Sequence, residues 1–249
     1  MQPSQPSQSP HQPTPPFNFP AARRLREALG MAHGHVAYGM RASYGLTYIT
    51  ADTIAAWERG LAAPSSAELT ALAATLWCAP GELMGAARTL REHRIARGLA
   101  PEDVARQAGV EIQAYLRMEE TNSWRGNERQ SAALSRALGL SLPDFVSVTG
   151  RAEPLAELLR SAVTTRWQGY VRPVAKLLPV ERRHVEDVLR QMHDDYQSRM
   201  ARTLSWGGGA GPDASGEAGR DYLERVLEHF WPLVRGGGQA SWDPGAGRG

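Results

Sequence analysis

Cysteine, lysine and long apolar runs are nearly missing from this 249-residue chain. The single cysteine, Cys78, excludes a disulfide framework and a cysteine-based metal site, which fits a reducing cytoplasm. No apolar run reaches the ~18 residues that a membrane span needs, and the polar N-terminus lacks a signal-peptide pattern. We therefore expect a cytoplasmic protein without a membrane partner.

An excess of charge of either sign is also missing, since the formal net charge is +2. The basic residues are 27 arginines and one lysine, Lys176, a bias that indicates a GC-rich genome more than a function. There is no nucleophile elbow, no paired-carboxylate pattern and no glycine-rich phosphate loop after a strand. His184 and His193 lie on different faces of a helix, which is not a metal spacing. We expect no enzyme activity, no cofactor and no metal.

The most informative pattern lies in residues 87–120. An arginine-rich first helix ends at Gly98, and Pro101 suits the first turn of a short second helix. Gly109 then supplies the turn to a third helix at residues 111–120. Two short helices joined by a tight glycine turn predict a helix-turn-helix, which lays its second helix in the major groove of DNA.

The spacing V-A-x-x-x-G-V-x-x-x-x-Y-x-x-M-E resembles the helix-turn-helix of the Cro/cI-type repressors, the XRE family. The preceding residues repeat this pattern, because Ile54, Trp57 and Glu58 match the family's I-x-x-I-E and RRLREALG parallels LREHRIARG. The chain therefore contains an internal duplication of about 65 residues. We therefore expect an all-α chain with two tandem XRE-like five-helix domains, at residues 21–85 and 86–150.

The resemblance implies that the partner is double-stranded DNA, bound by a homodimer, and that the function is transcriptional regulation near the nucleoid. The groove-facing positions it implies are Ile112, Gln113, Ala114 and Arg117 in the second domain, and Thr50, Asp52, Thr53 and Ala56 in the first. Glutamine pairs with adenine and arginine with guanine, so the second domain is the better base reader. In the family, the last glutamate of the motif has a structural role, and Glu58 occupies this position.

Arginines cluster on the first helix of each domain. They are Arg23, Arg24 and Arg26 in the first domain, and Arg88, Arg91, Arg94 and Arg97 in the second. We expect Arg91 and Arg94 in particular to contact phosphates, although a solvated helix face explains the same spacing.

Three departures from the family leave an alternative open. Residues 21–150 hold 14 arginines and 13 acidic residues, a net charge of +1, which is low for a DNA-binding region. Asp52 faces the expected groove, and Glu111 stands where the family prefers serine or threonine. The alternative function is a protein-interaction scaffold with degenerate helix-turn-helix domains.

Several aromatic residues also permit two interpretations. The turn of the first domain is enlarged and carries Tyr38, Tyr44 and Tyr48, which either pad the core of a longer second helix or reshape the DNA-facing turn and bind a partner. We favour padding of the core. Trp124 either covers the edge of the core or helps neighbouring arginines to hold the DNA backbone.

The rest of the chain is expected to be helical or disordered. The expected segments are a disordered tail at 1–20, a helical region at 151–204, a glycine-rich linker at 205–219, a terminal amphipathic helix at 220–235 and a disordered tail at 236–249. Within the helical region, Pro173 and Pro179 bound a break before a helix of about 25 residues. That helix either packs on its own chain or forms a dimer seam. A small-molecule sensor pocket around Trp167, Tyr170, His184 and His193 is a further alternative. The terminal helix docks on its own chain or on a protein partner.

Overall fold

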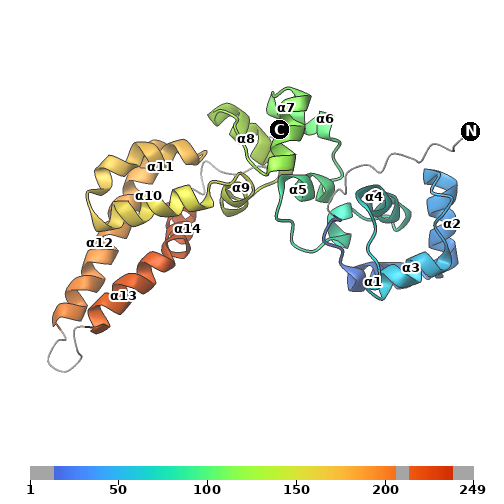
Figure 1. Ribbon diagram of the computed structural model, residues 1–249, viewed down its shortest axis with the longest axis horizontal. Helices are drawn as coiled ribbons and strands as arrows, with labels where there is room; N and C mark the ends of the chain where they lie inside the picture. Colours follow the sequence, from blue (N-terminus) through green and yellow to red (C-terminus); the bar gives the residue numbers. More distant parts are fainter. Residues whose placement is uncertain (1–13, 206–212, 238–249) are drawn as a thin grey trace, which may run out of the picture. The chain divides into compact units, whose positions relative to one another are not determined.

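The computed structural model describes residues 14–205 and 213–237, and within these ranges the secondary structure is helical without a β-strand (Figure 1). The predicted all-α fold is therefore confirmed. The chain divides into two compact units, residues 1–103 and 104–249. The predicted domain border between residues 85 and 86 lies inside the first unit.

The helices of the first unit are α1 (Phe19–Ala28), α2 (His33–Tyr44), α3 (Ala51–Glu58), α4 (Ser66–Thr75), the 3₁₀ helix η1 (Pro80–Leu83), α5 (Leu90–Ala96) and the first residues of α6 (Pro101–Ala108). The second unit continues with α7 (Ile112–Thr121), α8 (Glu128–Leu138), α9 (Leu142–Val148), α10 (Ala152–Thr164), η2 (Trp167–Tyr170), α11 (Val171–Leu177), α12 (Arg182–Ser205), α13 (Asp213–Glu224) and α14 (Val226–Gly237).

Short polar side chains begin four helices of the first unit. Asn18, Thr50, Ser65 and Thr89 each accept a hydrogen bond from the backbone N–H three residues later, which satisfies a group that the helix itself leaves without a partner. Helix α2 ends at Gly45, whose φ of +68° is the left-handed conformation that glycine adopts without strain. These local signals fix where the chain turns.

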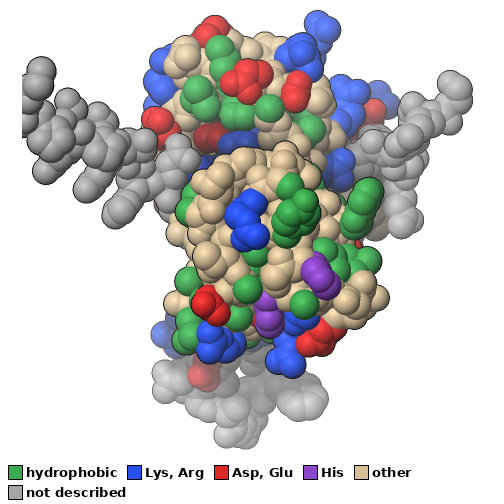
Figure 2. All heavy atoms as spheres, turned by 90° about the vertical axis from the view of Figure 1, so that its right-hand side faces the viewer, with side chains coloured by type: hydrophobic (Ala, Val, Ile, Leu, Met, Phe, Trp, Pro, Cys, Tyr) green, Lys and Arg blue, Asp and Glu red, His purple; other side chains and the backbone are tan. Residues whose placement is uncertain are grey.

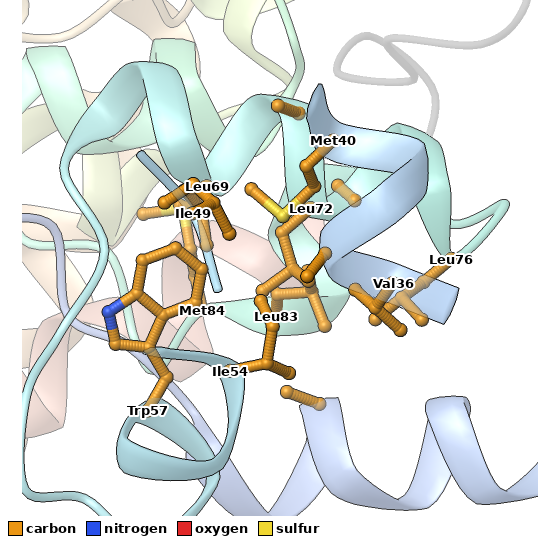
Figure 3. Packing of buried hydrophobic residues seen from close by; sticks show 14 of the residues in the cluster. Val36, Met40, Ile49, Ile54, Trp57, Leu69, Leu72, Leu76, Leu83 and Met84 are labelled. Atoms are coloured by element: carbon orange, nitrogen blue, oxygen red, sulfur yellow. The ribbon is translucent and has the colours of Figure 1, made fainter. Parts of the chain in front are cut away.

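One hydrophobic cluster holds α2, α3, α4 and η1 together. Its labelled members in Figure 3 are Val36, Met40, Ile49, Ile54, Trp57, Leu69, Leu72, Leu76, Leu83 and Met84. Gly39 brings α2 close to α4, since a Cβ at this position would lie 2.9 Å from Cγ2 of Thr75. Ile54 and Trp57, which match the two apolar positions of the family motif, are both buried, at 1% and 3% exposure.

The N-terminal tail is shorter than predicted. The backbone N–H of Asn18 donates to the carbonyl of Leu83 at 2.8 Å, and Phe17 forms an isolated bridge with Met84. Helix α1 then begins at Phe19. The prediction of disorder is therefore wrong for residues 14–20, because their backbone pairs with the first unit, and residues 1–13 lie outside the described part of the chain.

The helical region predicted at residues 151–204 is built around α12. Its apolar side, formed by Val185, Val188, Leu189 and Met192, is buried against α10, α11, α13 and α14 of the same unit. The expected helix of about 25 residues is confirmed, since α12 has 24. This part of the apolar face packs within its own chain, as in the first of the two alternatives.

The break expected at residues 172–179 is wrong in its first part. Residues 171–177 form helix α11, in which Pro173 is the third residue. A proline in the first turn removes no helical hydrogen bond, because the N–H groups there have no partner within the helix. The chain becomes extended only at Leu178.

The end of the chain also differs from the sequence-based prediction. Residues 213–219 of the expected linker are the first residues of α13, and the expected single helix at 220–235 is divided between α13 and α14 at Arg225. Residues 206–212 and 238–249 lie outside the described part. The apolar side of this segment is buried on α10 and α12, as expected for docking on the same chain, through Tyr222, Val226, Phe230 and Val234.

Candidate nucleic-acid interface

The two expected copies bury residues at matched positions. These are Val36 and Ala37 with Val104 and Ala105, Ile54 and Trp57 with Tyr115 and Met118, Leu72 and Leu76 with Leu134 and Leu138, and Leu83 with Phe145. Backbone conformations recur as well, because Gly30 and Gly98 both have φ +64° after the first helix of each copy. The duplication inferred from the sequence is thus matched by burial and by backbone conformation.

A short turn joins α6 to α7. Gly109 has φ +67°, and the N–H of Val110 donates to the carbonyl of Ala105 at 3.0 Å. The side chain of Glu111 then begins α7 by accepting the N–H of Ala114 at 2.9 Å. Backbone N–H groups of Gln113 and Ala114 lower the pKa of Glu111, so this carboxylate replaces the serine or threonine that the resemblance led us to expect.

Helix α7 has one buried side and one exposed side. Tyr115 and Met118 are buried at 0% and 8% exposure, whereas Gln113 and Arg117 are exposed. Ile112 and Ala114 are partly buried. Since Gln113 and Arg117 are one helical turn apart, their amide and guanidinium groups lie on the same outer face of α7.

The loop between α7 and α8 resolves the two interpretations of Trp124. Its indole is 4% exposed, and Nε1–H donates to Oγ of Ser131 at 2.8 Å. Trp124 therefore covers the core edge and does not hold a DNA backbone. The neighbouring Arg125 and Arg129 are exposed.

Helix α3, the counterpart of α7 in the first unit, offers few groups that could read bases. The hydroxyls of Thr50 and Thr53 lie 3.0 Å apart and cap the helix, which occupies both side chains locally. Asp52 is exposed and Ala56 is partly buried. The predicted positions of the first unit thus present one carboxylate and no free amide or guanidinium group.

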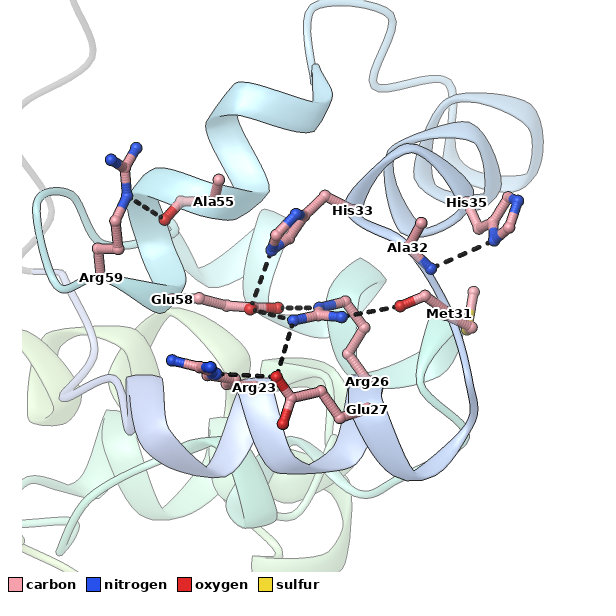
Figure 4. A network of polar contacts seen from close by, with 10 residues as sticks. All are labelled: Arg23, Arg26, Glu27, Met31, Ala32, His33, His35, Ala55, Glu58 and Arg59. Atoms are coloured by element: carbon pink, nitrogen blue, oxygen red, sulfur yellow. Dashed lines mark hydrogen bonds and ion pairs between the residues drawn. The ribbon is translucent and has the colours of Figure 1, made fainter.

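Arg26 does not lie on the surface with its neighbours. Its Nε and Nη2 donate to the Glu58 carboxylate at 2.6 and 2.8 Å, and Nη1 donates to the carbonyl of Met31 at 2.8 Å (Figure 4). Nε2 of His33 lies 3.1 Å from the same carboxylate. The hydrogen bond with Glu58 raises the pKa of Arg26. Arg26 therefore joins α1 to the end of α3 and is not one of the exposed arginines of α1.

The position of Arg26 recurs in the second copy. Arg26 stands four residues before Gly30, and Arg94 stands four residues before Gly98. Nη1 of Arg94 donates to the carbonyl of Leu99 at 3.0 Å, as Arg26 does to that of Met31. The contact with the turn after the first helix thus recurs in both copies. Recurrence alone does not predict burial, because the exposed Arg23 recurs as Arg91 in the same way. Glu58 has the structural part that the resemblance implied.

The other predicted phosphate contacts lie on α5. Arg91 and Arg94 are both partly buried. Nη2 of Arg91 lies 3.3 Å from Oγ of Ser66, and Arg94 holds the turn that follows α5. Each side chain therefore has a local structural contact in the first unit.

The three tyrosines of the enlarged turn are on the surface. Tyr38, Tyr44 and Tyr48 are 67%, 45% and 62% exposed, so the favoured interpretation that they pad the core is wrong. Trp77, directly after α4, is 88% exposed. Figure 2 views the side on which α2 lies in Figure 1 and shows hydrophobic, basic, acidic and histidine side chains dispersed over it.

The residues proposed for other chemistry have structural contacts. His184 Nε2 lies 2.7 Å from the carbonyl of Val234, and His193 Nδ1 lies 3.0 Å from that of Val163. Burial raises the pKa of the Cys78 thiol to about 11.

Within residues 14–205 and 213–237, no three His, Cys, Asp or Glu side chains are grouped to hold a metal ion. In these same ranges, no helix combines the length and apolarity needed to cross a membrane.

No protein-family model matches the chain, and neither a curated protein nor a solved structure is significantly similar to it. The resemblance to Cro/cI-type repressors therefore rests on the residues and spacings given above.

Proposed function

We propose that the protein binds double-stranded DNA and regulates transcription in the cytoplasm, with α6 and α7 as a helix-turn-helix and α7 in the major groove. The observation that carries this proposal is the outer face of α7, where Gln113 and Arg117 are exposed one turn apart. A glutamine can pair with both the N6 and N7 of adenine, and an arginine with O6 and N7 of guanine. Each such pair discriminates between bases by roughly 1–3 kcal/mol.

The two copies contribute unequally in this proposal. The exposed face of α3 offers Asp52, whose carboxylate can accept a hydrogen bond from cytosine but is repelled by phosphates. Sequence specificity then comes mainly from α7, and the first unit has a supporting role. Helix-turn-helix proteins of this kind bind paired half-sites as two-fold dimers, so we propose a homodimer on DNA.

Selection from a random duplex pool by the full chain, at moderate salt and with non-specific competitor, tests the proposal. We expect a recovered motif of two spaced half-sites. Arg117→Ala should lower affinity and relax one guanine position, and Gln113→Ala should relax one adenine position. The matched control is Arg202→Ala, since Arg202 is an exposed arginine of α12 that donates to its own helix. Unchanged base preference in both α7 variants would reject α7 as the reader.

A protein-interaction scaffold is the second candidate, and the exposed aromatic side chains of the first unit favour it. Tyr38, Tyr48 and Trp77 are each more than half exposed, and aromatic residues are enriched in protein interfaces. Salt dependence separates the two functions. A protein with about six phosphate contacts loses roughly 10³-fold in DNA affinity between 50 and 200 mM salt, whereas a scaffold recovers no DNA motif at any salt concentration.

A further inference from the structure

A pocket of about 200 Å³ lies inside the second unit, between the first turn of α8 and the end of α11. Its polar lining includes Asn127, Glu128 and Ser131 from α8 and its cap, Arg151 just before α10, and Lys176 from α11. Sites for drug-sized ligands usually have about 300–1,000 Å³, so this pocket suits a smaller molecule. None of its lining residues belongs to the exposed face of α7 described above.

Arg151 is a partly buried cation without a countercharge. Its Nη1 donates to the carbonyl of Leu177 at 2.9 Å, and its guanidinium carbon lies 5.1 Å from the centre of the Phe145 ring. Among the described residues, no carboxylate forms an ion pair with it. Burial lowers the pKa of Arg151, which means that the surroundings disfavour its charge. Buried charges are ordinarily paired with an opposite charge. The Arg151 guanidinium is therefore a suitable partner for an anionic ligand.

A second cation lies on the same pocket. Lys176 is the single lysine of the chain and is exposed, and the described residues provide no ion pair for it either. The first turn of the 11-residue helix α8 adds the positive end of a helix dipole. The lining contains two basic residues, Arg151 and Lys176, and one acidic residue, Glu128. The formal charge of the lining is therefore positive.

We propose that this pocket binds a small phosphate dianion, either inorganic phosphate or the phosphate monoester of a small molecule. A guanidinium offers a planar pair of N–H donors to two phosphate oxygens, and an ammonium group adds a compact point charge. Two cations match the charge of a dianion better than that of a singly charged group. The ligand would neutralise Arg151 where the protein itself does not.

The position of the pocket connects it to α7. Ser131 lines the pocket, and the preceding Gln130 donates through Nε2 to the carbonyl of Gly109 at 2.9 Å, in the turn before α7. The same turn of α8 thus contacts both the pocket and the turn before α7. The phosphate site itself does not depend on DNA binding, and it is tested without DNA.

The test uses the indole N–H of Trp124, which donates to Ser131 at the wall of the pocket. Inorganic phosphate is titrated into the full, ¹⁵N-labelled chain, and the Trp124 resonance is identified with Trp124→Phe. Glycerol 2-phosphate and dimethyl phosphate are titrated separately, because the first is a monoester dianion and the second imitates the singly charged DNA backbone. Lys176→Gln removes one cation, and Arg172→Gln removes a cation of the same helix that does not line the pocket.

We expect a saturable shift of the Trp124 indole with inorganic phosphate, with glycerol 2-phosphate or with both. Lys176→Gln should weaken binding about tenfold or more, Lys176→Arg should restore most of it, and Arg172→Gln should leave it unchanged. No saturable shift with either dianion, or equal weakening by Arg172→Gln, would overturn the proposal. Binding of dimethyl phosphate as tight as that of the dianions would also overturn it and assign the pocket to the DNA backbone.

Discussion

Among the polar groups of Figure 4, the Glu58 carboxylate is the one whose removal should weaken the contact between α1 and α3 most. The side chains of Arg26 and Glu58 are 10% and 7% exposed, so Glu58→Ala leaves a guanidinium buried without its countercharge. Breaking a buried ion pair in this way costs about 3–5 kcal/mol. We expect the lower end, about 3 kcal/mol, because an open pocket borders both side chains and lets water reach Arg26.

Hydrogen exchange followed by mass spectrometry measures this loss where it occurs. At about 1.36 kcal/mol for each factor of ten, a loss of about 3 kcal/mol should speed exchange in peptides from α1 and α3 by about a hundredfold. Peptides from α12 serve as an internal reference, because they belong to the other compact unit. Glu58→Gln should have an intermediate effect, since an amide oxygen still accepts one of the hydrogen bonds.

The matched control is Glu27→Ala. Glu27 pairs with Arg23 on the exposed side of α1, where solvent screens the interaction, so we expect no measurable change in exchange. Equal protection of α1 and α3 in the Glu58→Ala and Glu27→Ala proteins would refute the reasoning. Arg26 would then not depend on Glu58 for its place in the unit.

Three further changes test other local arguments. The folded-state pKa of Glu111 lies below the ordinary 4.5. The stabilisation of α7 by the Glu111 carboxylate is therefore present above pH 4.5 and is lost as the pH falls through the lowered pKa. Glu111→Ser should remove this pH dependence from the hydrogen exchange of α7 amides. Gly126→Ala would place a Cβ against the buried ring of Trp124 and should lower stability by about 1–3 kcal/mol in urea unfolding. Trp77 has φ +54° where Gly139 follows α8 with φ +63°. Trp77→Gly should therefore raise the free energy of unfolding, followed in urea, by up to about 1 kcal/mol, and Gly139→Ala should lower it. A Trp77→Gly protein that is less stable than the parent would show that the exposed indole makes a stabilising contact.

The sequence predicted those parts of the fold that local patterns determine. The helix end at Gly98, the helix start at Pro101 and the turn at Gly109 were each predicted from one residue, and all three are found. The resemblance placed Gln113 and Arg117 on the outside of α7, where both are exposed, while Tyr115 and Met118 are buried. Each of these inferences needs information from one helical segment alone.

The errors arose where a distant residue or a local exception decides the outcome. Nothing near Arg26 distinguishes it from Arg23, and its burial depends on Glu58, 32 residues further along the chain. Tyr48 was predicted to pad the core, but it is 62% exposed and the neighbouring Ile49 is the buried residue, at 0% exposure. Pro173 was taken as a helix breaker, although the first turn of a helix accepts proline.

The divergence of the two copies limits how the proposed DNA binding can work. If α7 alone reads bases, its two readers supply about 2–6 kcal/mol of discrimination, taking roughly 1–3 for each pair. Specific operators are bound about 4–10 kcal/mol more tightly than other DNA, so a single chain reaches at best the lower part of that range. A second chain on a neighbouring half-site would double the number of readers. Since the apolar side of α12 is covered within its own unit, that pairing must use another surface, and the exposed aromatic residues Tyr38, Tyr48 and Trp77 are the part of the first unit best suited to it.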